Sequence, residues 1–316
     1  MSVDININEA KQRAERIRGK KEFELPQTNS KIEDKKYLEV FGAYYYPGIR
    51  IGDNLELTFK EKLTNTIGKP IYFPKAEYKF NFYDKHGFFD TFGFVGIQNE
   101  NVKEALKILN TIFGVSLIFD FDSLSVREFE LYSMKMDPES LSIGGFSYFD
   151  QNTKRFSPYS SHGLRKRAIP LDSMYKIINI AEKVSPDEAT NELVLFLLES
   201  FTHFYNSEFS QSFLFGWLVA EKHISQLFEE MLAEKKVSHN RKEKFKNHDK
   251  WSTETKIETL NFAGIINSKD YDFLITFNTK RNNFAHKGKT IEQPESKELY
   301  EFSKNIIKDE INRIIK

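Results

Sequence analysis

The chain has 316 residues, of which 40% are hydrophobic and 29% are charged, a balance typical of a folded protein with a sizeable core. It contains no cysteine, which excludes disulfides, thiolate catalysis and cysteine-ligated zinc. The 46 basic residues are balanced by 46 acidic ones. This balance excludes a protein that coats nucleic acid through overall positive charge, so any contact with nucleic acid must be local.

Residues 1–36 are predicted to be a polar N-terminal extension. Residues 8–21 have the composition of a short polar helix, and the first residues are charged where a signal peptide would have an apolar segment. No run approaches the roughly eighteen apolar residues that a membrane span needs. We therefore expect a cytoplasmic protein with no membrane partner.

Residues 37–150 are predicted to form a β-rich α+β module. Aromatic and β-branched residues alternate with polar ones, and Gly and Pro separate the runs. The segment 99–114 has the spacing of a helix, with Gly114 as the residue that ends it. The expected strands lie within 37–49, 54–63, 69–97, 115–121, 127–134 and 142–149.

Residues 151–170 are predicted to be a basic linker. The segment is rich in Ser, Pro and Gly and has no acidic residue, and its five cations are Lys154, Arg155, Arg165, Lys166 and Arg167. The loop either grips RNA or only connects two parts of the chain, and the sequence leaves both interpretations open.

Residues 171–316 are predicted to form an all-α bundle. Apolar residues recur at helical spacing through 210–236, where Phe213, Trp217 and Ile224 share the stripe expected to face the core. The predicted helices are 172–184, 186–206, 210–236, 253–264, 270–287 and 295–316. The expected fold class is α+β, a β-rich front followed by a helical bundle.

The segment Lys280–Lys289, KRNNFAHKGK, ends one of these helices and contains no acid. Asn282 and His286 are four residues apart and therefore neighbours on the helix surface. Histidine near neutral pH serves as a base or an acid, and the planar fork of arginine holds a phosphate. This combination suits metal-free RNA cleavage, in which a 2′-hydroxyl is deprotonated and charge develops on the phosphate.

Arg281 and His286 are five residues apart, roughly a third of a turn around the helix axis, so one helix does not bring their heads together well. Two copies of the helix that cross could each contribute an Arg and a His to one cleft. This is a geometric reason to expect a homodimer.

An arginine, a following asparagine and a histidine, placed before the last helix of a bundle, resemble the motif of HEPN domains. RNNFAH matches the form with four intervening residues, and the bundle from 187 to 316 has the expected size. HEPN proteins are helical and usually dimeric. Many are metal-independent endoribonucleases of toxin–antitoxin, abortive-infection and CRISPR-associated antiviral defence. The resemblance implies that Arg281 and His286 are the catalytic pair and that Asn282 assists them. It does not extend to the front of the chain.

The remaining candidate residues surround this motif. Glu221 could face the cleft and steady Arg281, or lie on the solvated face, and Asn278 is unusual in a helix interior. His223 is expected at the surface. Neither a metal site nor a cofactor is predicted. The candidate RNA-binding residues are Lys280, Lys287, Lys289, Arg165, Lys166 and Arg167.

Three functions compete. The first is an endoribonuclease of a toxin or defence system, whose N-terminal module senses a trigger, an antitoxin or a regulatory ligand. The second is a non-catalytic HEPN module that binds nucleotide, RNA or a protein partner. The third is an adaptor whose bundle only dimerises. In the plainest alternative, His286 is a favourable cation at a helix end and Arg281 a solvated surface residue.

Overall fold

The computed structural model describes residues 37–45, 49–52, 77–91, 93–137, 143–148, 168–239, 245 and 251–315. The predicted helix at 8–21, the predicted strand within 54–63 and most of the basic linker lie outside these residues. The strands are β1 (Leu38–Tyr44), β2 (Arg50–Ile51), β3 (Tyr78–Phe82), β4 (Lys85–Phe89), β5 (Phe94–Gln98), β6 (Tyr132–Met136), β7 (Ile143–Tyr148) and β8 (Ala168–Ile169). The helices are α3 (Val102–Ile118), α4 (Leu171–Val184), α5 (Glu188–Tyr205), α6 (Phe209–Glu234), α8 (Thr253–Phe262), α9 (Ser268–Lys287) and α10 (Gln293–Ile315), with a 3-10 turn at Glu128–Glu130.

Six strands form one sheet in the order β3-β4-β5-β1-β6-β7, and every neighbouring pair is antiparallel. Strand β1 lies in the middle, with Val40 opposite Gln98 of β5 on one side and Met134 of β6 on the other. The short strands β2 and β8 pair in parallel as a separate two-stranded sheet. Helix α3 lies between β5 and β6 in the chain, and the other helices follow the antiparallel sheet, an order that confirms the predicted α+β class.

Strand β1 is apolar on both faces, and the alternation of its side chains divides them between two clusters. Phe41 and Ala43 belong to the large core that includes α3, whereas Val40 and Tyr44 belong to a small cluster on the opposite face. Its mostly apolar sequence follows from burial on both sides, because strands buried on both faces lose the usual alternation of polar and apolar residues.

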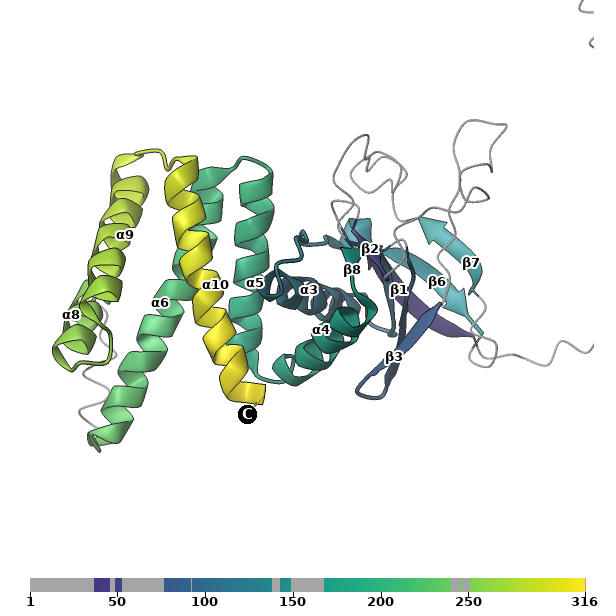
Figure 1. Ribbon diagram of the computed structural model, residues 1–316, viewed down its shortest axis with the longest axis horizontal. Helices are drawn as coiled ribbons and strands as arrows, with labels where there is room; N and C mark the ends of the chain where they lie inside the picture. The colour runs from purple at the N-terminus through teal and green to yellow at the C-terminus, as the bar shows by residue number, and fades with distance from the viewer. Residues whose placement is uncertain are drawn as a thin grey trace, which may run out of the picture. The chain divides into compact units, whose positions relative to one another are not determined.

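Helix α3 packs against both the sheet and the bundle, as Figure 1 shows. Its hydroxyl Thr111 Oγ1 donates to Asn191 Oδ1 of α5 at 2.8 Å. The residues of α3 share one hydrophobic core with β1 and β5 on one side and with α4, α5 and α10 on the other. Residues 37–316 form one compact unit. The predicted boundary at 151–170 lies mostly outside the described residues, so the division into a β-rich module and a bundle stays a prediction.

The predicted end of α3 is wrong, because the helix continues to Ile118 and takes in the residues expected to be a strand at 115–121. Residues 111–118 are all buried, and a helix buried on every side loses the periodicity that distinguishes it from a strand. Gly114 does not end the helix. A Cβ on Gly114 would lie 2.5 Å from Val194 Cγ1, so the glycine is required for close contact with α5.

Helices α5, α6 and α10 pack closely through small residues. Ser200 Oγ of α5 donates to the carbonyl of Ser212 in α6 at 2.9 Å, and Ser303 Oγ of α10 donates to the carbonyl of Gly216 at 2.9 Å. The predicted core stripe of α6 is confirmed, with Phe213, Trp217 and the other apolar members of the stripe buried. Helices α8 and α9 follow and place α9 beside α6 and α10 (Figure 1).

Candidate functional site

The RNNFAH motif occupies the last two turns of α9. Asn267 begins the helix, since its Oδ1 accepts from the N–H of Asp270 at 2.9 Å. Gly288 ends the helix in the left-handed conformation with φ 62°, and its N–H donates to the carbonyl of Phe284 at 3.1 Å. The predicted stop at Gly288 is confirmed, and it fixes His286 in the final turn.

The three motif residues differ in how they are held. Arg281 and Asn282 are half-buried, and Arg281 Nη1 donates to Asn282 Oδ1 at 3.0 Å. The amide therefore contacts the guanidinium, not the imidazole. His286 is exposed, and among the described residues no hydrogen bond or ion pair joins it to Arg281.

The predicted RNA-binding lysines fall into two groups. Lys287 and Lys289 are exposed beside His286. Lys280 Nζ instead lies 2.7 Å from Glu295 Oε1 of α10 and 5.2 Å from the centre of the Phe277 ring. This lysine lowers the pKa of Glu295, chiefly through their hydrogen bond. The other three predicted cations, Arg165, Lys166 and Arg167, lie outside the described residues.

The two predicted supporting residues lie elsewhere in the packing. Glu221 Oε1 accepts a hydrogen bond from Thr253 Oγ1 at 2.6 Å, so its carboxylate is engaged at the start of α8. No contact joins it to Arg281 in the part of the chain that the structure describes. Asn278 is 6% exposed and lies on the stripe of α9 that faces the core, together with Leu274.

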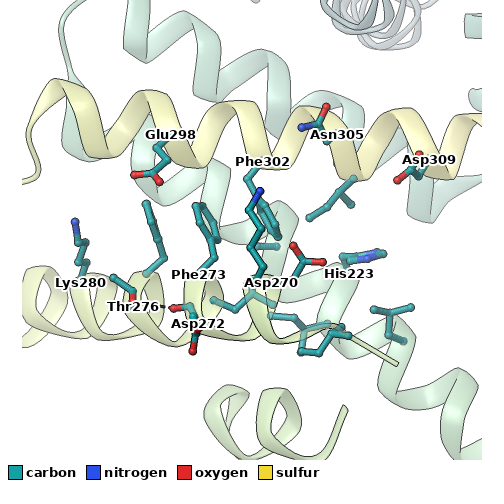
Figure 2. A pocket seen from close by; sticks show the side chains of 18 of the residues that line it. His223, Asp270, Asp272, Phe273, Thr276, Lys280, Glu298, Phe302, Asn305 and Asp309 are labelled. Atoms are coloured by element: carbon teal, nitrogen blue, oxygen red, sulfur yellow. Dashed lines mark hydrogen bonds between the residues drawn. The ribbon is translucent and has the colours of Figure 1, made fainter. Parts of the chain in front are cut away.

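A pocket of about 780 Å³ lies between α6, α9 and α10, directly N-terminal to the motif along α9. Figure 2 shows side chains from α9 and α10 facing each other across it. Its inner wall is apolar and includes Ala220 and Ile224 of α6 and Leu274 of α9. Lys280, the residue before Arg281, lines the end of the pocket nearest the motif.

A column of phenyl rings crosses this region. The Phe302 and Phe273 rings stack with centroids 4.3 Å apart, Phe273 stacks on Phe277 at 4.2 Å, and Phe277 stacks on Phe213 at 5.7 Å. Phe273 and Phe302 are half-buried, whereas Phe213 and Phe277 are buried. The column therefore ties α6, α9 and α10 together and presents its outer rings to the pocket.

A histidine and a carboxylate meet at the far end of the pocket. His223 Nδ1 of α6 lies 3.2 Å from Glu310 Oε1 of α10, and Arg313 Nη1 lies 3.1 Å from the same oxygen. The nearby His223 imidazole is the largest of the effects that lower the pKa of Glu310. The His223 side chain is 19% exposed, so the predicted surface residue is partly covered where it lines the pocket. The acid beside it, Glu310, lies 87 positions later in the sequence.

The pocket was not predicted from the sequence. Phe273 and Phe277 have i,i+4 spacing, which indicates a shared helix face, but Phe302 is on another helix and its contact with them depends on tertiary packing. No local pattern in the sequence pairs His223 with Glu310. The spacing of the α9 aromatic residues was the available signal, and it indicated only a packed face.

Among the described residues, no group of three or more His, Asp or Glu side chains is arranged to hold a metal ion. Of the helices that the structure describes, none is both long and apolar enough to cross a bilayer. Comparisons with protein-family models, curated proteins and solved structures found no match.

Proposed function

We propose that the protein is a metal-independent endoribonuclease whose helical bundle is of the HEPN type. The observation that carries the proposal is the arrangement at the end of α9, where a half-buried Arg281 is held by Asn282 and His286 is exposed one turn later. The exposed Lys287 and Lys289 add positive charge for a phosphate backbone. The motif's resemblance to HEPN domains supports the same activity.

The chemistry assigns a role to each group. Arg281 holds the scissile phosphate and stabilises the charge that develops on it, and His286 transfers a proton to or from the reacting oxygens. Asn282 keeps the guanidinium oriented. The exposed side chain of His286 has the access to substrate that such a role requires.

The active form in this proposal is a homodimer. Arg281 and His286 are separated by roughly 140° around α9, and among the described residues no hydrogen bond joins their side chains. Two copies of α9 placed across a cleft supply an arginine from one copy and a histidine from the other. A defence or toxin role in the cytoplasm, with an antitoxin or ligand acting on the sheet-containing part, belongs to the same proposal.

Purified full-length protein incubated with total RNA and EDTA tests the activity. We expect products with 2′,3′-cyclic phosphate and 5′-hydroxyl ends. Arg281→Ala and His286→Ala should each slow cleavage by about a hundredfold or more, the range for loss of a proton-transfer or charge-stabilising group. His239→Ala, at an exposed histidine after α6, is the matched control. Cleavage by both motif variants at the parent rate would refute the proposal, and a strict monomer by concentration-dependent mass measurement would refute the dimer.

A non-catalytic binding module is the second candidate, and the pocket between α6, α9 and α10 is the observation that favours it. Its volume lies in the range of small-molecule sites. In this case His286→Ala would leave binding intact and the parent protein would cut no RNA.

A further inference from the structure

We propose that the pocket between α6, α9 and α10 binds a linear aliphatic polyamine. The inference rests on the pocket's rings, its charges and its length, and it does not depend on ribonuclease activity.

The half-buried rings of Phe273 and Phe302 supply an apolar surface for a methylene chain. Their stacked faces, 4.3 Å apart between centroids, lie in the middle of the pocket (Figure 2). Leu227 and Ile306 extend the apolar surface around them. An alkyl segment that covers this apolar surface removes it from water, which favours binding.

The charges along the pocket leave carboxylates without a cation. Of the cations that line it, Lys280 is paired with Glu295 and Arg313 with Glu310. Asp272, Glu298 and Asp309 line the pocket and have no hydrogen bond or ion pair to their carboxylates among the described residues. Lys269 also lines the pocket and has no ion pair among the described residues, so its charge offsets one of these carboxylates. The pocket is therefore net acidic and favours a ligand with several positive charges.

The positions of these carboxylates favour an elongated ligand. Figure 2 shows Glu298 toward the Lys280 end of the pocket and Asp309 toward the His223 end, with Phe302 between them. The two acids are eleven positions apart on one helix, which places them about 16 Å apart along its axis at 1.5 Å per residue. Spermine spans a comparable length and has an ammonium at each end with alkyl segments between.

Other ligand classes fit this pocket less well. A nucleotide phosphate would meet the unpaired carboxylates and be repelled. A divalent metal needs converging ligands, and the described acids of the pocket form no cluster that could hold one. A polyamine satisfies the separated carboxylates and the aromatic middle together.

Isothermal titration of the full-length protein with spermine at low salt tests the proposal. We expect one saturable site per chain, with putrescine at least about tenfold weaker because it is too short to reach both carboxylates. Glu298→Gln and Asp309→Asn should each weaken spermine binding about tenfold, since each removes one charge contact. Phe302→Leu should weaken it as well. Glu298 and Asp309 are exposed, so their amide variants leave the core intact.

Glu301→Gln is the matched control, because this acid is exposed on α10 and does not line the pocket. Spermine binding should be unchanged in Glu301→Gln and in His286→Ala, and the latter separates this site from the proposed nuclease. The proposal is overturned by the absence of saturable binding, by unchanged affinity in both pocket variants, or by an equal loss in Glu301→Gln. Mg²⁺ that blocks spermine binding at concentrations similar to those of spermine would also overturn the proposal, because the site would then attract any positive charge.

Discussion

At the residue scale, the two ends of the RNNFAH motif differ in exposure and in how firmly their side chains are held. Arg281 is half-buried and its guanidinium is held by Asn282, so little freedom is lost when it grips an anion. His286 is exposed and lies two residues before Gly288, where a substrate or a second chain reaches it without rearrangement of the core. A fixed cation beside an accessible proton-transfer group is the arrangement that the proposed chemistry uses.

Gly114 is the position where a single added methyl group should disturb the packing most directly. A Cβ there would lie 2.5 Å from Val194 Cγ1 and 2.9 Å from the Val194 carbonyl oxygen, closer than such atoms approach. We expect Gly114→Ala to lower the free energy of unfolding by about 1–3 kcal/mol, the usual cost of overpacking. Urea denaturation measures the change.

A second variant tests the cause. Val194→Ala in the Gly114→Ala background removes the methyl group in the way, so part of the loss should be recovered relative to Val194→Ala alone. No recovery would assign the effect to the Val194 carbonyl, and a stable Gly114→Ala protein would contradict the contact between α3 and α5.

At the element scale, the end of α9 depends on the left-handed conformation of Gly288. Its φ of 62° costs little for glycine and about 1 kcal/mol or more for most residues with a Cβ. No other atom lies within 4 Å of a Cβ built there, so the cost is conformational and not steric. We expect Gly288→Ala to lower Tm, and Gly288→Asn to lower it less, because asparagine tolerates this conformation. Equal effects in thermal unfolding would contradict this account.

Helices α9 and α10 are joined by the Lys280–Glu295 ion pair at 2.7 Å. Because the pair lowers the pKa of Glu295 in the folded protein, its stabilisation is present above the usual glutamate value of 4.5 and is lost as the pH falls through the lowered pKa. Both side chains are about 30% exposed, so we expect Glu295→Gln to cost less than about 1 kcal/mol at pH 7.

The measurement is urea denaturation of Glu295→Gln and parent at pH 7 and at decreasing acid pH. The difference between them should shrink as Glu295 becomes protonated. Glu301→Gln, at an exposed acid of the same helix, should show no such convergence. A difference that persists unchanged into acid would show that the charge of Glu295 contributes nothing.

At the scale of the whole molecule, α3 makes the sheet and the bundle share a core. Phe113 of α3 is fully buried, and its ring centroid lies 4.5 Å from that of Tyr45, which follows β1. Opposite, Thr111 is hydrogen-bonded to Asn191 of α5. Loss of either neighbour would leave the apolar surface of α3 in water, so the two parts should unfold together.

Hydrogen exchange measured by mass spectrometry in increasing urea tests this cooperativity. We expect the amides of β1 and β5 and those of α6 to lose protection at the same urea concentration. In Phe113→Ala, which should cost about 3–5 kcal/mol, both sets should shift together to lower urea. A shift confined to the sheet peptides would instead support the predicted division into separate domains.

Hydrophobic periodicity and turn residues predict the helices and most of the strands that the structure describes. The stripe from Phe213 to Met231 and the stop at Gly288 were readable because burial on one face and backbone conformation leave a local pattern. The pattern disappears where an element is buried all round, which is why the sequence predicts a strand where α3 ends. The candidate motif was readable for the same reason, since its residues lie within two turns of one helix.

Tertiary packing, and no local sequence pattern, selects which side chains from different elements meet. It placed Phe302 on Phe273, His223 against Glu310, Lys280 against Glu295 and Thr253 on Glu221. None of these pairs lies within one helix, and each was selected by the packing of two helices, in which close contact and the neutralisation of half-buried charge favour one arrangement. Contacts of this kind set the separation of α9 and α10 and so leave the pocket between them. No local sequence pattern indicates that separation.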